Sequence, residues 1–244
     1  MKSIEKIAIS GTYRSGKTTT AVALSLLTGI PRTEARSLRE IIRVTMPGRT
    51  IEDCSANELA ELGLLRFRDR MINESKINGK FFSDGSCLHE WVYGQGRLTM
   101  GIAPEENFLK KFLVFARNMR SYRGYVSFME AYGTVAKRHA KESYDIFIHL
   151  PIEFSGNKNE HRAVFEDFRV LTDQLLRDTL DEIQIPYYFV RGNIEERLEQ
   201  ILDLLSLKPR ISIADAVLQA EERVRLGTLL GESYIHDDLQ QKKA

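Results

Sequence analysis

Gly11-Thr12-Tyr13-Arg14-Ser15-Gly16-Lys17-Thr18 is the stretch of this sequence that decides the fold. Its spacing, G-x-x-x-x-G-K-[ST], is that of a phosphate-binding loop, in which successive backbone N–H groups converge on phosphate oxygens. Gly11 and Gly16 allow the tight turn and the close approach of a ligand to the backbone. Lys17 is expected to reach the β- and γ-phosphates of a nucleotide, and the Thr18 hydroxyl is expected to bind Mg²⁺.

The residues on either side of the loop have the patterns that this motif requires. Ile4 to Ser10 read as a short apolar strand, and Lys17 to Leu27 read as a helix with an apolar stripe. Gly29 and Pro31 then end that helix. The sequence therefore predicts ATP or GTP with Mg²⁺ as cofactors, held at the helix N-terminus. The predicted contacts are Gly11, Thr12, Tyr13, Arg14, Ser15, Gly16, Lys17, Thr18 and Thr19.

Size and composition indicate an ordinary globular protein. The chain has 244 residues, of which 43% are hydrophobic and 28% charged. A net charge of +1 gives no overall field that would favour nucleic acid or an acidic membrane, so neither is expected as a partner. Cys54 and Cys87 are too few for a disulfide framework. With no signal-like segment and no apolar run near the ~18 residues of a membrane span, a cytoplasmic protein is expected.

Strand and helix patterns alternate along the chain. Strands are predicted at 4–10, 29–33, 80–83, 144–150 and 186–190, and helices at 34–44, 56–78, 105–116, 127–142, 163–182 and 194–205. This alternation predicts an α/β fold, a three-layer sandwich around a mostly parallel five-stranded sheet. We expect one domain over 1–205, with a lid and acceptor region at 85–142 and a second lid loop at 154–163. Residues 206–244 are expected to form a helical extension, and a homodimer is left open.

Two acidic residues follow predicted strands, where ligands of parallel sheets bind. Asp84 closes the third strand and could hold Mg²⁺ through water or accept the proton of an attacking hydroxyl; the structural alternative is a cap of the next helix. Glu34 could be a general base or bind a substrate hydroxyl, and Arg36 could fix a charged substrate or the transferred phosphoryl group. The alternative for Glu34 is a favourable place at a helix N-terminus.

Two later loops are predicted to complete the nucleotide site. Arg162 lies in a polar stretch after the fourth strand, where a lid arginine could neutralise charge during phosphoryl transfer. Lys158 is the second choice, and an exposed loop charge is the alternative. Arg191 and Asn193 follow the last strand, where a loop commonly meets the nucleotide base. The guanine-reading pattern Asn-Lys-x-Asp does not occur in the sequence.

An aromatic-rich segment follows Asp84. Trp91 and Tyr93 could line an acceptor pocket and stack on a planar ring, whereas Phe108, Phe112 and Phe115 lie at helical spacing, which is more typical of core. Arg120 lies in a basic and aromatic stretch that is interpreted as a charged lid or an anionic-substrate site. The predicted substrate-binding residues are therefore Glu34, Arg36, Asp84, Trp91, Tyr93 and Arg120.

These motifs together resemble the P-loop small-molecule kinases of the nicotinamide riboside kinase and deoxynucleoside kinase type, an AAA-like group. The resemblance rests on the phosphate loop, on Glu34-x-Arg36, on Ser83 to Ser86 with Tyr93-Gly94 behind it, and on the strand from Tyr144 to Pro151. It implies transfer of the γ-phosphoryl group of ATP or GTP to an alcohol of a small acceptor. It also implies Asp84 or Glu34 as the activating carboxylate and Arg162 as the lid arginine.

One departure from the family pattern concerns the residue after the strand-end acid. Many such kinases have arginine there, whereas this chain has Gly85. An arginine contact to acceptor or phosphate must then come from elsewhere, with Arg36, Arg97 and Arg120 as candidates. The predicted function is a Mg²⁺-dependent small-molecule kinase with Lys17, Asp84, Glu34 and Arg162 as catalytic residues. The alternative is a nucleotide-binding switch or NTPase that engages a protein or lipid partner.

Overall fold

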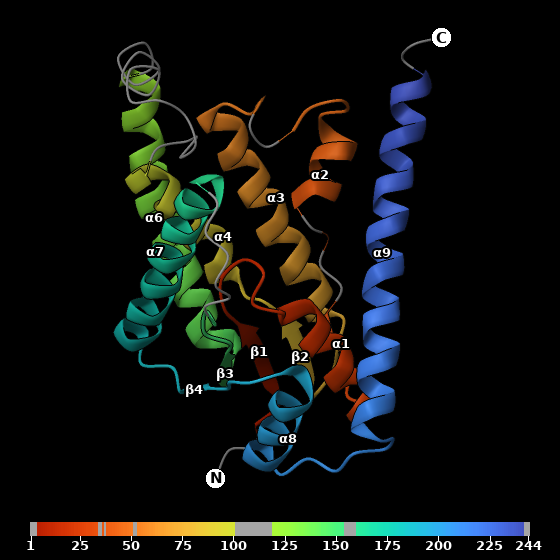
Figure 1. The fold of residues 1–244 in the computed structure, drawn as a ribbon. Coiled ribbons are helices and arrows are strands. Elements are labelled where there is room, and N and C mark those ends of the chain that lie inside the picture. Colours follow the sequence, from red (N-terminus) through yellow and green to blue (C-terminus); the bar gives the residue numbers. More distant parts are fainter. Residues whose placement is uncertain are drawn as a thin grey trace.

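The computed structural model describes residues 4–33, 36, 38–50, 53–100, 119–153 and 160–241. Figure 1 shows a sheet surrounded by helices. The strands are β1 (Lys6–Ser10), β2 (Phe81–Asp84), β3 (Ile146–His149) and β4 (Tyr187–Phe189). The helices are α1 (Lys17–Thr28), α2 (Leu38–Thr45), α3 (Ala56–Ser75), α4 (Cys87–Met100), α6 (Met119–Ser143), α7 (Glu160–Ile183), α8 (Ile194–Leu205) and α9 (Ile213–Gln241).

All four strands of the described sheet are parallel, in the order β2-β1-β3-β4. The register pairs Ile9 of β1 with Asp84 and Ser10 with His149. The carboxyl ends of the three neighbouring strands therefore meet at one edge, where the phosphate loop begins. This arrangement confirms the predicted α/β fold.

The fifth predicted strand, at 29–33, is reduced to a single bridge within the described residues. Arg32 bridges Phe82 in parallel, the Thr33 N–H donates to the Phe82 carbonyl at 2.9 Å, and the Phe82 N–H donates to the Pro31 carbonyl at 2.9 Å. Proline has no N–H to donate, so it is confined to sheet edges and does not support a longer ladder. The segment thus lies along the edge of β2 without becoming a strand.

The two faces of the sheet bury two separate hydrophobic clusters. Ile7, Ile9 and Ile148 pack with α1, α8 and α9 on one face. Ala8 and Phe147 point to the opposite face and pack with α3, α4, α6 and α7. Because successive side chains of a strand alternate between faces, these short strands can be apolar on both sides. The result is the predicted three-layer sandwich.

Helix α4 was not among the predicted helices, because Gly94 and Gly96 weaken its helical pattern. Tertiary packing explains both glycines. A Cβ on Gly94 would lie 2.5 Å from the Met129 Cε atom of α6, and one on Gly96 would lie 2.9 Å from Thr172 of α7. The glycines therefore let α4 approach α6 and α7 closely, which places its first turn beneath the phosphate loop.

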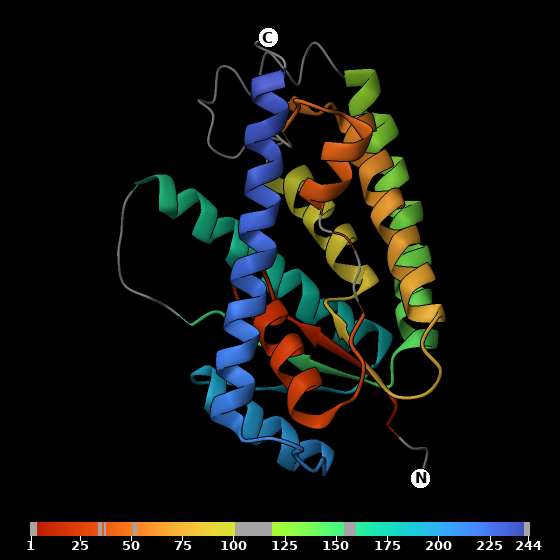
Figure 2. The ribbon, with the colours of Figure 1, turned by 90° about the vertical axis from the view of Figure 1, so that its right-hand side faces the viewer.

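In the predicted C-terminal helical extension, the structure describes a single long helix, α9. The first turns of α9 bury Ala216, Val217 and Ala220 against the cluster that contains α1. Figure 2 shows the rest of α9 continuing past α1 and away from the sheet. The predicted helix at 105–116 lies outside the described residues. Among the described residues, no helix is both long enough and apolar enough to cross a membrane.

The packing of α1 can be tested by truncating one of its buried side chains. Leu24 is 0% exposed, so Leu24→Ala should lower the free energy of unfolding by about 2–5 kcal/mol. Leu218→Ala on α9 is the matched control, because Leu218 is 68% exposed and its loss should cost less than about 0.5 kcal/mol. Urea denaturation followed by circular dichroism measures both. Equal losses in the two variants would contradict the assignment of α1 to the core.

Candidate nucleotide and acceptor site

The phosphate loop makes its turn with three residues at positive φ. Gly11, Arg14 and Gly16 have φ values of 140°, 58° and 89°. A Cβ on Gly11 would lie 2.5 Å from the backbone oxygen of Leu150, so only glycine fits there. Gly16 directly precedes α1, and the loop therefore leads into the positive end of the helix dipole.

Donors from three helices bind the carbonyl oxygens of this loop. The Lys17 Nζ atom of α1 donates to the Thr12 carbonyl at 2.6 Å, and the Arg197 guanidinium of α8 donates to the Ser15 carbonyl at 2.8 Å. The Nε2 atom of His89 in α4 lies 3.1 Å from the Gly11 carbonyl. With these carbonyls satisfied, the loop has its N–H groups to offer an anion, the arrangement of a backbone nest.

Two further contacts fix the side chains of the loop. The Thr12 hydroxyl lies 2.8 Å from the Thr172 hydroxyl of α7. The Tyr13 ring stacks on Tyr93 of α4, with centroids 4.0 Å apart and an angle of 18° between the planes. The predicted loop residues are thus brought together, and Thr12 and Tyr13 face the protein, where sequence reasoning had them contact the nucleotide.

The lowered pKa of Lys17 indicates that its charged form is destabilised in the fold. Burial lowers the pKa of Lys17 from 10.5 to about 8, and the negative charge of Asp84 opposes this shift. Asp84 ends β2, beside β1, and its side chain is half-buried. Among the described residues, no side chain forms a hydrogen bond or ion pair with the Asp84 carboxylate. The predicted acid therefore lies within electrostatic reach of the phosphate-loop lysine and is available to a ligand.

Gly85 is explained by an arginine that sequence reasoning missed. The Arg70 side chain of α3 is 1% exposed and donates to the Ser83 hydroxyl at 3.1 Å and to the Asp84 carbonyl at 3.0 Å. A Cβ on Gly85, whose φ is +83°, would lie 3.3 Å from the Arg70 guanidinium. The Arg70 guanidinium therefore lies against Gly85, the position at which the family pattern has an arginine.

Arg70 and Arg66 both lie close to the buried carboxylate of Glu90. Arg66 Nε lies 2.8 Å and Arg70 Nη2 lies 3.5 Å from the Glu90 Oε1 atom. The Glu90 side chain is only 3% exposed. Among the described residues, none donates a hydrogen bond to its Oε2 atom. A buried carboxylate oxygen without a donor is costly, so it marks a position where a ligand could donate a hydrogen bond.

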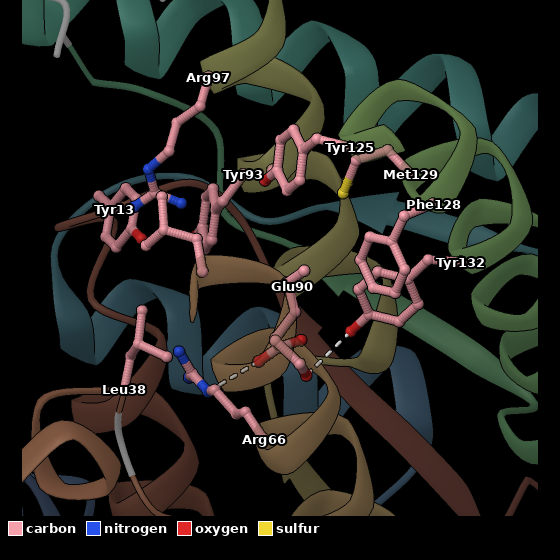
Figure 3. A pocket seen from close by; sticks show the side chains of 14 residues that line it. Tyr13, Leu38, Arg66, Glu90, Tyr93, Arg97, Tyr125, Phe128, Met129 and Tyr132 are labelled. Carbon is pink, nitrogen blue, oxygen red and sulfur yellow. Dashed lines mark hydrogen bonds and ion pairs between the residues drawn. The ribbon is translucent and has the colours of Figure 1, made fainter. Parts of the chain in front are cut away.

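Glu90 and Tyr93 line a small cavity next to the phosphate loop, shown in Figure 3. Its volume is about 30 Å³, room for a water molecule or two. Tyr93 of α4 and Tyr125, Phe128 and Tyr132 of α6 supply aromatic rings to the wall, and Arg66, Glu90 and Arg97 contribute the charges. The complete lining is Tyr13, Leu38, Leu59, Ala60, Gly63, Arg66, Glu90, Tyr93, Gly94, Arg97, Tyr125, Phe128, Met129 and Tyr132.

Two of the predicted substrate residues lie away from this cavity, and the side chain of a third is not among those described. Trp91 lines a separate groove, where its indole N–H donates to the Met129 carbonyl at 2.9 Å and Lys137 lies over its ring. Arg36 is an exposed residue paired with Asp69 at 2.6 Å. Arg120 belongs to α6, but its side chain is not among those described.

The other predicted nucleotide residues have local roles or lie outside the described part. Asn193 caps α8 through a reciprocal pair of bonds with Glu196, and Gln200 binds the backbone of Arg191. Arg162 lies in the first turn of α7 and not in a loop, because that helix begins at Glu160; its side chain is not described. Glu34 and Lys158 lie outside the described residues.

Comparison with known proteins confirms the fold and the family. The family model of an AAA domain matches residues 6–197. Two solved structures of deoxyadenosine kinase from M. mycoides are similar, one with bound dATP (TM-score 0.57, 14% identity) and one with bound dCTP (0.53, 16%). Each match covers 82% of this chain, and 99% and 98% of the respective kinase chain.

A solved structure of NadR protein in complex with NR is similar over 86% of this chain and 53% of its own, with a TM-score of 0.51 and 14% identity. No curated protein sequence matches the chain. At these identities, the solved structures show the α/β P-loop fold alone. The predicted resemblance to kinases of this group is therefore confirmed at the level of family and fold.

The pKa of Lys17 predicts how stability depends on pH. In the unfolded chain the lysine returns to its ordinary pKa of 10.5, whereas in the fold it is about 8. Between these values Lys17 binds more protons in the unfolded state, so its contribution to the free energy of unfolding should rise with pH from about 8 to 10.5, measured as the difference from a variant without the lysine. Lys17→Met should remove this rise. Urea denaturation of both proteins across this range measures it, and parallel pH profiles would contradict the burial of Lys17.

Proposed function

This chain belongs to the AAA domain family, and we propose that it is a kinase that transfers the γ-phosphoryl group of ATP or GTP to a hydroxyl of a small molecule. One observation carries the proposal: the phosphate loop, the Lys17 ammonium and the Asp84 carboxylate, whose charge acts on Lys17, meet at one sheet edge beside a cavity with aromatic walls. A nucleotide site and an acceptor site this close are what direct transfer requires.

The residues at this edge fit a Mg²⁺ ion that arrives with the nucleotide. Mg²⁺ prefers oxygen ligands and is commonly held by one or two protein side chains together with phosphates. Thr18 supplies an exposed hydroxyl at the start of α1, and Asp84 supplies the carboxylate. When bound, the ion would neutralise charge that develops on the phosphate oxygens.

The chain's own residues divide the remaining work. The loop N–H groups would bind the β-phosphate, and the Lys17 ammonium would stabilise negative charge on the γ-phosphoryl oxygens. Asp84 or Glu34 would accept the proton of the attacking hydroxyl, and Arg162 would neutralise charge on the transferred phosphoryl group. Arg191 and Asn193 would border the nucleotide base.

The cavity chemistry favours an acceptor with a planar ring and a hydrogen-bond donor. Tyr13 already stacks on Tyr93, so that wall accommodates a flat ring, and Glu90 offers a buried oxygen to a donor such as an amino group. The Nε atom of Arg66 lies 2.8 Å from Glu90 Oε1, so its positive charge faces the carboxylate. The deoxyadenosine kinase and NadR structures support a nucleoside-like acceptor. A ligand of that size must displace side chains such as Tyr13, because the cavity is only about 30 Å³.

Product analysis separates the kinase from the alternative, a nucleotide-binding switch that hydrolyses slowly. With ATP labelled at the γ-phosphate and a panel of nucleosides, a kinase should place label on an added alcohol, whereas an NTPase should release free phosphate. Lys17→Ala should lower turnover by about 100-fold or more, since it removes a charge that stabilises the transition state. Lys208→Ala, an exposed lysine before α9, is the control and should leave turnover unchanged. Label found only in free phosphate would reject the kinase.

The acceptor pocket predicts a selective effect of Glu90. Glu90→Gln keeps the shape but loses the charge, so the KM for the acceptor should rise about tenfold while the KM for ATP stays the same. Glu130→Gln, an exposed residue of α6, is the matched control. Steady-state kinetics with each substrate varied in turn gives both constants. A rise in the KM for ATP with an unchanged acceptor KM would place the acceptor elsewhere.

A further inference from the structure

His89 is a buried histidine that the proposed reaction does not yet use. It lies in the first turn of α4, is 2% exposed, and bonds to two separate segments. Its Nδ1 atom lies 2.9 Å from the backbone N of Ser86, and its Nε2 atom lies 3.1 Å from the carbonyl oxygen of Gly11. One ring thus joins the turn after Asp84 to the first residue of the phosphate loop.

The partners of the ring fix where its proton lies. The Nδ1 atom lies 2.9 Å from the Ser86 N, 3.0 Å from the Ser86 hydroxyl and 3.3 Å from the Ser86 carbonyl. A backbone amide can only donate, so the shortest of these contacts requires the Nδ1 atom to accept. A carbonyl can only accept, so the Nε2 atom must carry the hydrogen that is donated to Gly11. Burial, followed by the nearby charges of Lys17 and Arg70, lowers the pKa of His89 well below its usual value. The neutral Nε2–H tautomer satisfies both contacts.

The turn between Asp84 and Ser86 is held from two sides. A Cβ on Gly85 would lie 3.6 Å from the His89 Nδ1 atom and 3.3 Å from Arg70. Arg70 also binds the Asp84 carbonyl at 3.0 Å. The backbone that carries the Asp84 carboxylate is therefore fixed by Arg70 to α3 and by His89 to the phosphate loop.

We infer that His89 is a positioning residue that holds the phosphate loop and Asp84 at a set separation through its Nε2–H bond to the Gly11 carbonyl. The inference depends on the proposed function in one respect, which is that Asp84 acts at the bound phosphates. Without this bond, the Gly11 carbonyl lacks the donor that helps to hold the loop turn. Asp84 and Lys17 then lose the link that fixes them relative to one another.

Two variants differ in whether they keep the critical donor. The amide nitrogen of glutamine in His89→Gln reaches about as far as the Nε2 atom, whereas that of asparagine in His89→Asn reaches only as far as Nδ1. His89→Gln should therefore keep ATP affinity and kcat within about threefold of the unaltered protein. His89→Asn should lose about tenfold in each, the fold-change of one buried hydrogen bond. Equal ATP affinities and kcat values in the two variants would overturn the inference.

Coupling to Asp84 separates positioning from a general loss of stability. Asp84→Asn should reduce kcat less in the His89→Asn background than in the unaltered protein, because the carboxylate is already misplaced there. Two effects that simply multiply would overturn the coupling. If the unaltered protein binds ATP but transfers no phosphoryl group, the proposed kinase fails, and the ATP affinities of the same variants still decide the role of His89.

A measurement on the unaltered protein covers the case in which His89→Asn does not fold. Nitrogen NMR of the histidine rings at pH 7 should include a signal from a neutral ring protonated at Nε2 alone that disappears in His89→Gln, which assigns it to His89. A His89 ring protonated at Nδ1, or at both nitrogens, would overturn the inference. The ring should stay in the same form when Mg²⁺ and ATP are added.

Discussion

The site depends on donors for the carbonyl oxygens of the phosphate loop. A loop that turns its N–H groups toward an anion must turn carbonyls toward the protein, where each needs a hydrogen-bond donor. His89 and Arg197 supply two such donors from α4 and α8, and Lys17 supplies a third from α1. The shape of the loop is therefore set by helices that are distant in sequence, and not by the eight residues of the motif alone.

The close packing of α4 brings side chains of this helix to both the phosphate loop and the cavity. Gly94 and Gly96 let the helix approach α6 and α7, so that the same helix supplies His89 beneath the loop and Glu90 to the cavity. Its charges are balanced from α3, where Arg66 and Arg70 face Glu90. Because a buried carboxylate without counter-ions would be costly, α3 and α4 form one electrostatic unit. Arg70 extends that unit to the backbone of Asp84.

The sequence predicted what is local and missed what is brought together by tertiary contacts. The motif from Gly11 to Thr18 specifies its own strand, turn and helix, and an apolar run that ends in Asp84 specifies a strand end. Arg70 and Glu90 carried no signal, because an arginine on a helix is usually solvated and its burial depends on α3 packing over β2. His89 belongs to no recognised motif, and its signal in the sequence was proximity to Asp84, five residues before it.

The low pKa of Lys17 indicates that placing its charge at this site lowers the stability of the fold. Burial destabilises the ammonium, and its bond to the Thr12 carbonyl and the charge of Asp84 offset only part of that cost. A bound phosphate would place further negative charge beside the ammonium and so offset more of the cost of its burial. The lysine is therefore held in place before the ligand arrives, which is how a preorganised site avoids reorganisation during the reaction.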